Sequence, residues 1–232
     1  MRRRRYVRSA GQVSARRAGE TELRPTNRRL ENFSDGVFAI VITIMVIDVR
    51  IPASLAFSND PPALMQFSTA LGAYALSFIV IANLWTSHHY LVFTLSRPTR
   101  STIWFNNLLL FWITMLPLTT RFLGHFPRSP RAAASFGIVA FCATAAFMLL
   151  RSHARRTSHN ELHRAIHSRV LRRTWLFLAI YGASIPLAFV EPWLSWLCFA
   201  TVVAMLFVPV VSTQRVRESM TDDHRNLDRS CP

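Results

Sequence analysis

The chain has 232 residues, 51% of them hydrophobic, and a positive mean hydropathy, which favours a small polytopic membrane protein over a soluble domain. All 27 basic residues are arginine and the net charge is +15, but no basic module interleaved with aromatic residues is present, which argues against a nucleic-acid partner. The three cysteines have no framework spacing, so neither a disulfide nor a metal site is expected.

The N-terminal segment, residues 1–25, carries eight arginines with Ser, Gly and Thr between them and has no apolar periodicity. This composition predicts a disordered basic tail in the cytoplasm, with contact to anionic membrane lipid as a secondary role. A secretory signal would need an apolar core directly after the first charges, and none appears before residue 33.

The first apolar segment runs from Gly36 to Ile47 and is interrupted only by Thr43. Within a helical span at about 30–49, the stretch from Phe33 to Val49 would be roughly 25 Å long, close to the hydrocarbon thickness of a bilayer. At about 100° per residue, Ile40, Ile44 and Ile47 fall within roughly 60° of one another. An apolar stripe of this kind could face lipid, a neighbouring helix or a pore.

An acidic residue, Asp35, lies just inside this span, about 140° around the helix from Ile40. A buried acid needs hydrogen-bond donors, and Arg29 and the end of the second span, with Trp85, His88 and His89, supply them. We therefore predict an inter-helix hydrogen-bond network at this end of the spans. The alternative is that the histidines simply sit at the membrane interface.

The whole pattern predicts an all-α fold, a polytopic membrane helix bundle with six transmembrane helices per subunit. The domain covers 26–211, with spans at about 30–49, 63–92, 102–123, 132–150, 174–190 and 192–211, and 212–232 form a cytoplasmic C-terminal tail. Twenty-three of the 27 arginines fall on the side of the two termini. Because positive charge is retained in the cytoplasm, both termini are predicted to be cytoplasmic.

The string Arg29-x3-Phe33-Ser34-Asp35-Gly36-Val37-Phe38-Ala39-Ile40 resembles the first-helix signature of the transmembrane-protein-175 family. These are potassium channels of bacterial membranes and of animal endosomes and lysosomes, and the resemblance extends over about residues 24–212. It implies a multi-pass plasma-membrane homotetramer that conducts potassium and needs no cofactor. In the family the first helix lines the pore, and its apolar rings, often leucine, form the constriction and filter.

The resemblance also implies the roles of individual residues. The pore constriction would consist of residues on one face of the first helix: Ile40, Thr43, Ile44 and Ile47. Trp85 and His88 match the Trp and His that complement the signature. The inter-helix network would then comprise residues of the first and second spans: Arg29, Phe33, Ser34, Asp35, Trp85, His88 and His89. The chain lacks the Thr-Val-Gly-Tyr-Gly loop of ordinary potassium channels, so selectivity must have another basis.

Two other function classes are less consistent with the sequence. A proton- or cation-coupled secondary transporter could use Asp35 and His88 as a relay, but spans four to six hold no counterpart of the acidic signature. An enzyme is not expected, since no nucleophile–base pair or metal-ligand set appears. The ladder His159, His163 and His167 has helical spacing, but flanking arginines would repel a cation, which favours a solvated linker without metal.

Overall fold

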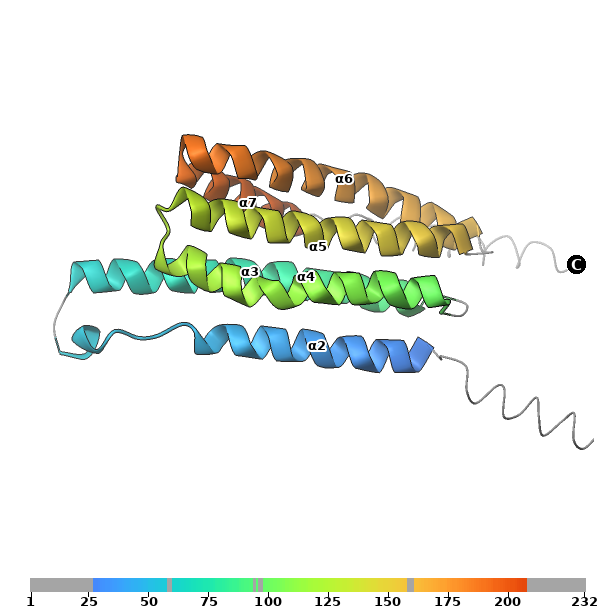
Figure 1. Ribbon diagram of the computed structural model, residues 1–232, viewed down its shortest axis with the longest axis horizontal. Helices are drawn as coiled ribbons and strands as arrows, with labels where there is room; N and C mark the ends of the chain where they lie inside the picture. Colours follow the sequence, from blue (N-terminus) through green and yellow to red (C-terminus); the bar gives the residue numbers. More distant parts are fainter. Residues whose placement is uncertain (1–26, 58–59, 94, 96–97, 158–160, 208–232) are drawn as a thin grey trace, which may run out of the picture.

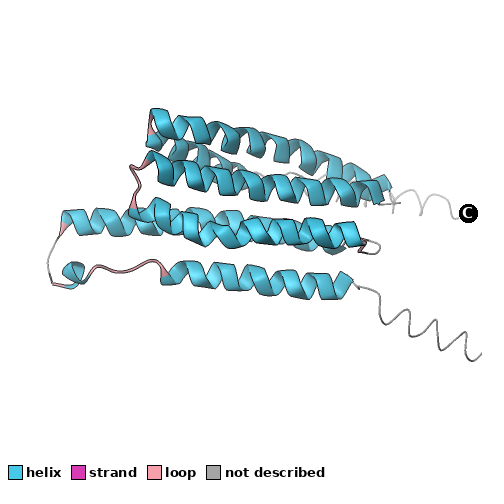
Figure 2. Cartoon of the chain, in the orientation of Figure 1, coloured by secondary structure: helices cyan, strands magenta, loops and turns pink. Residues whose placement is uncertain are grey.

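The computed structural model describes residues 27–57, 60–93, 95, 98–157 and 161–207. These residues form a short 3-10 turn, η1 (Ala53–Ala56), and six α-helices: α2 (Asn27–Ile47), α3 (Pro61–Phe93), α4 (Arg100–His125), α5 (Pro130–Thr157), α6 (Glu161–Val190) and α7 (Pro192–Leu206). No strand occurs among them, as Figure 2 shows, and the predicted all-α membrane bundle is confirmed. Both predicted tails, 1–25 and 212–232, lie outside the described residues.

The helices alternate in direction along the chain. Figure 1 shows α2, α4 and α6 running one way and α3, α5 and α7 running back. We call the two ends of the bundle the Asn27 end and the Ile47 end, after the first and last residues of α2. Five helices, α2 to α6, contain segments long and apolar enough to cross a membrane, and α7 is apolar but only 15 residues long.

Local sequence accounts for where several helices begin. Thr99 caps α4: its side chain accepts a hydrogen bond from the Thr102 backbone N–H at 3.2 Å, and Thr102 reciprocates. Pro130 and Pro192 occupy the first positions of α5 and α7, where a missing N–H costs nothing. Within the apolar segments the backbone has no water to bond, so a continuous helix is the only way to satisfy it.

The packing core lies around α5, which packs most extensively against α4 and α6. Aromatic rings fill its centre, with the Phe136 and Phe199 centroids 4.7 Å apart and Tyr181 beside them. Helix α2, by contrast, packs only on α3 and α4 within the described residues, and Figure 1 shows it at the outer edge of the bundle. A large part of its surface is therefore left uncovered.

Helical structure continues through most of the connection between the fourth and fifth spans. Helix α5 continues to Thr157 and α6 begins at Glu161, so most of the polar segment 151–173 is helical. Hydropathy locates the part of a helix that crosses the hydrocarbon, whereas Arg and Ala are good helix formers that prolong it beyond. His159 and the side chains of His163 and His167 lie outside the described parts of the structure.

Candidate functional site

One face of α2 is uncovered over most of the helix length. Ile40 is 58% exposed, Ile47 is 73% exposed, and Thr43 and Ile44 lie between them. The buried residues of α2 all lie on the opposite side, against α3 and α4: Leu30, Ser34, Phe38, Val41 and Met45. The isoleucine stripe that the sequence reveals therefore points away from its own subunit.

The hydroxyl of Thr43 gives this apolar face a specific polarity. Its proton is directed at carbonyl oxygens of its own helix, those of Ala39 at 2.9 Å and Ile40 at 3.0 Å. Because the hydroxyl donates inward, the oxygen lone pairs remain for a partner outside the helix. The exposed face thus offers an electron-rich oxygen beside isoleucine, which suits a cation better than an anion.

Two residues expected in the inter-helix network lie on this exposed face instead. Arg29 and Phe33 are both exposed, and at about 100° per residue both fall within roughly 20° of Ile40. Asp35 was expected to be buried, but it is only half-buried, because it lies at the edge of the surface that α2 packs on its neighbours. Helical register thus directs Arg29 away from the acid it was expected to pair with.

A fully buried set of polar side chains joins three helices near the Asn27 end. Asn106 of α4 donates from Nδ2 to Ser34 Oγ of α2 at 3.0 Å, and its Oδ1 lies 2.7 Å from His88 Nε2 of α3. Since an amide oxygen only accepts, His88 must donate from Nε2. Ser34 in turn donates to the Leu30 carbonyl at 2.8 Å. We call Ser34, Asn106 and His88 the buried triad.

Two more exposed contacts join α2 to α3 beside the buried triad. Trp85 donates its indole N–H to Asp35 Oδ1 at 2.9 Å, and the rings of Trp85 and His89 stack with centroids 5.9 Å apart. His89 Nδ1 lies 3.1 Å from Glu31 Oε1. Asp35 and His88, the relay of the transporter alternative, thus bond to different partners, Trp85 and Asn106.

Sequence reasoning missed two participants, Asn106 and Glu31. Asn106 interrupts an apolar membrane span, and a side-chain amide there needs a bonding partner, so its position alone was a usable signal. Glu31 lies four residues before Asp35 on the same helix, but only the tertiary fold brings it to His89. In the described part of the chain, no cluster of three metal-ligating side chains is present.

Comparison with known proteins shows which family the chain belongs to. A family model described as the endosomal/lysosomal potassium channel TMEM175 matches residues 29–117, the stretch that holds most of α2, the buried triad and the Trp85–Asp35 contact. A potassium channel of Chryseobacterium sp. (strain P1-3) is 31% identical over 202 residues, which is 85% of this chain and all of that protein. The chain belongs to the TMEM175 family. Its relatives are ion channels, and it is not an enzyme.

Further TMEM175 relatives agree with this assignment. A potassium channel of Streptomyces collinus is 34% identical over 135 residues, covering 56% of this chain and 66% of that one. The crystal structure of a lysosomal potassium-selective TMEM175 homolog from Chamaesiphon minutus superposes with a TM-score of 0.70 at 23% identity. It covers 80% of this chain and 98% of the other, so the TMEM175 channel fold is shared.

Proposed function

We propose that the protein is a homotetrameric, potassium-permeable channel of the plasma membrane, with α2 of each subunit lining a central pore. The observation that carries this proposal is the uncovered face of α2, which bears Ile40, Thr43, Ile44 and Ile47. Helix α2 packs only on α3 and α4 among the described elements, so four copies can meet around an axis through this face without disturbing the subunit core. The potassium-channel names of the relatives from Chryseobacterium and Streptomyces support the choice of ion.

The chemistry of this face suits a gated constriction. Rings of isoleucine from four subunits would form narrow apolar segments that empty of water and block ions until a small dilation rehydrates them. The Thr43 oxygens would lie next to these rings and replace part of the hydration shell of a passing cation. No resident cofactor is required, because potassium itself is what the pore carries.

We further propose that residues 26–211 form one channel domain with six spans and that both termini are cytoplasmic. The arginine asymmetry supports this orientation, because Arg28, Arg29 and Arg100 lie at the Asn27 end. In the assembled channel, Arg29 and Phe33 would face the pore entrance or a neighbouring subunit. The basic tail would contact anionic lipid.

Replacing an isoleucine of the exposed stripe tests the proposal directly. In Ile44→Asn the ring would hold water, so we expect higher single-channel conductance and a lower potassium-to-sodium permeability ratio. Each lowering of the free-energy barrier to ion passage by about 1.4 kcal/mol would raise the rate of ion passage about tenfold. The measurement is recording in planar bilayers with potassium and sodium on opposite sides, beside the mass of the purified oligomer.

Ile138→Asn is the matched control. Ile138 on α5 is 44% exposed, close to the 47% of Ile44, but lies on a helix that does not touch α2. We expect this variant to conduct like the parent. Equal currents in both variants would remove the isoleucine face from the permeation path, and a strictly monomeric protein would exclude a central pore. Potassium flux that requires a coupled gradient would favour the transporter alternative.

A further inference from the structure

The two ends of α2 are attached to the bundle by different kinds of contact. At the Asn27 end, α2 is joined to α3 and α4 by the buried triad and by the two α2–α3 contacts beside it. Over residues 41–50, a single polar side-chain contact reaches another helix within the described parts of the chain: Asp48 Oδ1 lies 3.4 Å from Arg121 Nη1 of α4. The Ile47 end therefore depends on apolar packing and one ion pair.

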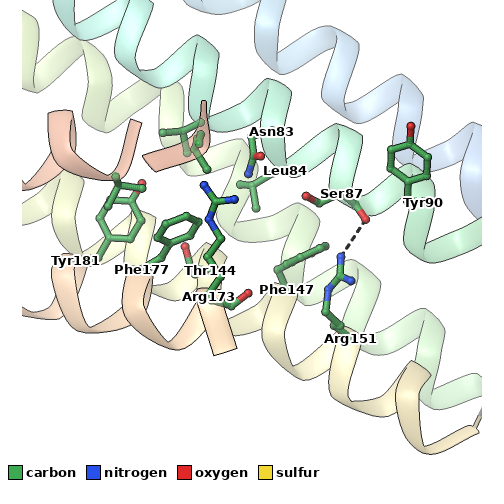
Figure 3. A pocket seen from close by; sticks show the side chains of 14 residues that line it. Asn83, Leu84, Ser87, Tyr90, Thr144, Phe147, Arg151, Arg173, Phe177 and Tyr181 are labelled. Atoms are coloured by element: carbon green, nitrogen blue, oxygen red, sulfur yellow. Dashed lines mark hydrogen bonds between the residues drawn. The ribbon is translucent and has the colours of Figure 1, made fainter. Parts of the chain in front are cut away.

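The contacts at the Asn27 end are themselves held in place by the rest of the bundle. Figure 3 shows Arg151 of α5 next to Ser87 of α3, and its guanidinium donates to the Ser87 carbonyl at 3.2 Å. Ser87 directly precedes His88, the fully buried member of the triad on α3. Moving α2 at this end would leave buried polar groups without partners, which is strongly unfavourable. The Asn27 end is thus the fixed end of α2.

A cavity of about 210 Å³ lies on the bundle side of α2 at the Ile47 end. The end of α2 and the residues after it line one side of the cavity, through Asp48 and Arg50, and α3 and α4 line the other. Helices α3 and α4 are closely packed here, since a Cβ built on Gly124 would lie 3.0 Å from Ala70 Cα. Close packing leaves these two helices little freedom, whereas the end of α2 borders open space. The movable part of this region is therefore α2.

The direction of the ion pair decides how it acts on the pore face. Arg121 belongs to α4, which packs on the side of α2 opposite the uncovered face. Attraction between Asp48 and Arg121 therefore draws this end of α2 toward its own subunit. Ile47 is 73% exposed and directly precedes Asp48. The ion pair thus also draws Ile47 away from the axis around which the uncovered faces of four subunits would meet.

We propose that Asp48 and Arg121 are positioning residues that hold the Ile47 ring of the pore apart, with α2 pivoting about its Asn27 end. This inference rests on the proposed function, because it needs four α2 helices around a central axis. While the pair is intact, the ring is wide and holds water. When the pair breaks, the end of α2 moves toward the axis, and the narrowed isoleucine ring empties of water and blocks ions. The pair therefore favours the open pore.

Single-channel recording of the full-length protein in planar bilayers tests the pair through charge exchange. Arg121→Asp places two carboxylates opposite each other, so we expect a lower open probability. An exposed ion pair shifts an equilibrium by about 1.4- to fivefold, and four pairs act on one pore, so the fall should be at least about fourfold. The double variant Asp48→Arg with Arg121→Asp restores the attraction and should open within about twofold of the parent.

Arg50→Gln is the matched control for the loss of a positive charge. Arg50 lies two residues from Asp48 and forms no ion pair in the described part of the chain, so this variant should open like the parent. An impermeant salt should lower the open probability of the parent and leave that of Arg121→Gln unchanged, because salt screens an exposed ion pair. A double variant that opens as rarely as Arg121→Asp, or the same salt response in the parent and Arg121→Gln, would overturn the pair.

Cross-linking between subunits separates failure of this inference from failure of the proposed function. Ile47→Cys, in a background with the three native cysteines replaced by serine, should form disulfide-linked dimers under oxidation by copper–phenanthroline. Adding Arg121→Gln should raise the rate of cross-linking severalfold, because the ring narrows. Equal rates with and without Arg121→Gln would overturn the positioning role alone. The absence of linked dimers in both proteins would contradict the central pore itself.

Discussion

Asn106 connects α2, α3 and α4, the three helices nearest the candidate pore, through side-chain hydrogen bonds. Its amide is fully buried and uses both ends, donating to Ser34 on α2 and accepting from His88 on α3. Side-chain hydrogen bonds between membrane helices are individually modest, but the loss of a shared partner leaves two buried groups unsatisfied. Correct seating of α2 against the bundle should therefore be sensitive to this position.

We expect Asn106→Leu to destabilise the protein by about 1–2 kcal/mol, because Ser34 and His88 both lose their bridging partner. The measurement is thermal unfolding of purified protein in detergent. Asn107→Leu is the matched control, since Asn107 is the same residue type on the same helix but is exposed. An Asn106→Leu variant as stable as its Asn107→Leu counterpart would show that the bridge contributes nothing measurable.

Among the elements, α5 and α6 approach each other closely at a glycine. A Cβ built on Gly137 would lie 2.6 Å from Ser184 Oγ and 3.4 Å from Ile185 Cγ1, so this contact has no room for a side chain. Ser184 cannot move freely, because its Oγ donates to the Tyr181 carbonyl and its own carbonyl accepts from Ser195. The absence of a side chain at one residue thus sets how closely two helices pack.

Gly137→Val should therefore lower the free energy of unfolding by about 1–3 kcal/mol, because the added side chain overpacks the contact between α5 and α6. Gly72→Val serves as the control, because a Cβ at Gly72 meets nothing within 4 Å. Chemical or thermal unfolding of both proteins would measure the difference. A similar loss of stability in the two variants would mean that the helix propensity of valine, rather than close packing at Gly137, determines the destabilisation.

At the scale of the whole molecule, the alternating helix directions bring the arginine-rich segments of the chain to the same end of the bundle. Arg100 opens α4 at the Asn27 end, whereas Arg121 and Arg128 lie near the Ile47 end, where α4 meets α5. The Asn27 end is thus the one to which the arginine-rich segments connect. The orientation proposed above rests on this distribution, because positively charged segments are poorly translocated.

Single cysteines test that orientation. In a background with Cys142, Cys198 and Cys231 replaced by serine, we expect Arg128→Cys to react with a membrane-impermeant maleimide applied to intact spheroplasts. Ser9→Cys should react only after lysis, because the basic tail is expected in the cytoplasm. Labelling of Ser9→Cys from outside, with Arg128→Cys protected, would reverse the proposed orientation.

The sequence by itself determined the class of fold and the character of α2. Continuous apolar segments admit only helices in a bilayer, and the spacing of Ile40, Ile44 and Ile47 places them on one face whatever surrounds the helix. The signature beginning at Arg29 is a contiguous string of residues, so it too indicated the family without any knowledge of which helices pack together. These properties depend on neighbours along the chain, and local pattern was therefore sufficient to predict them.

Only the tertiary structure decided which polar groups meet. Asn106 lies 72 residues from Ser34 and 18 from His88, and no local rule relates these three positions. The same holds for Arg151, whose charge indicated a solvated linker, yet which packing buries against Phe147 beside Ser87. Each of these outcomes depends on the rotation of one helix against another, which is set by the close packing of whole helix surfaces and cannot be read from the pattern of any single helix.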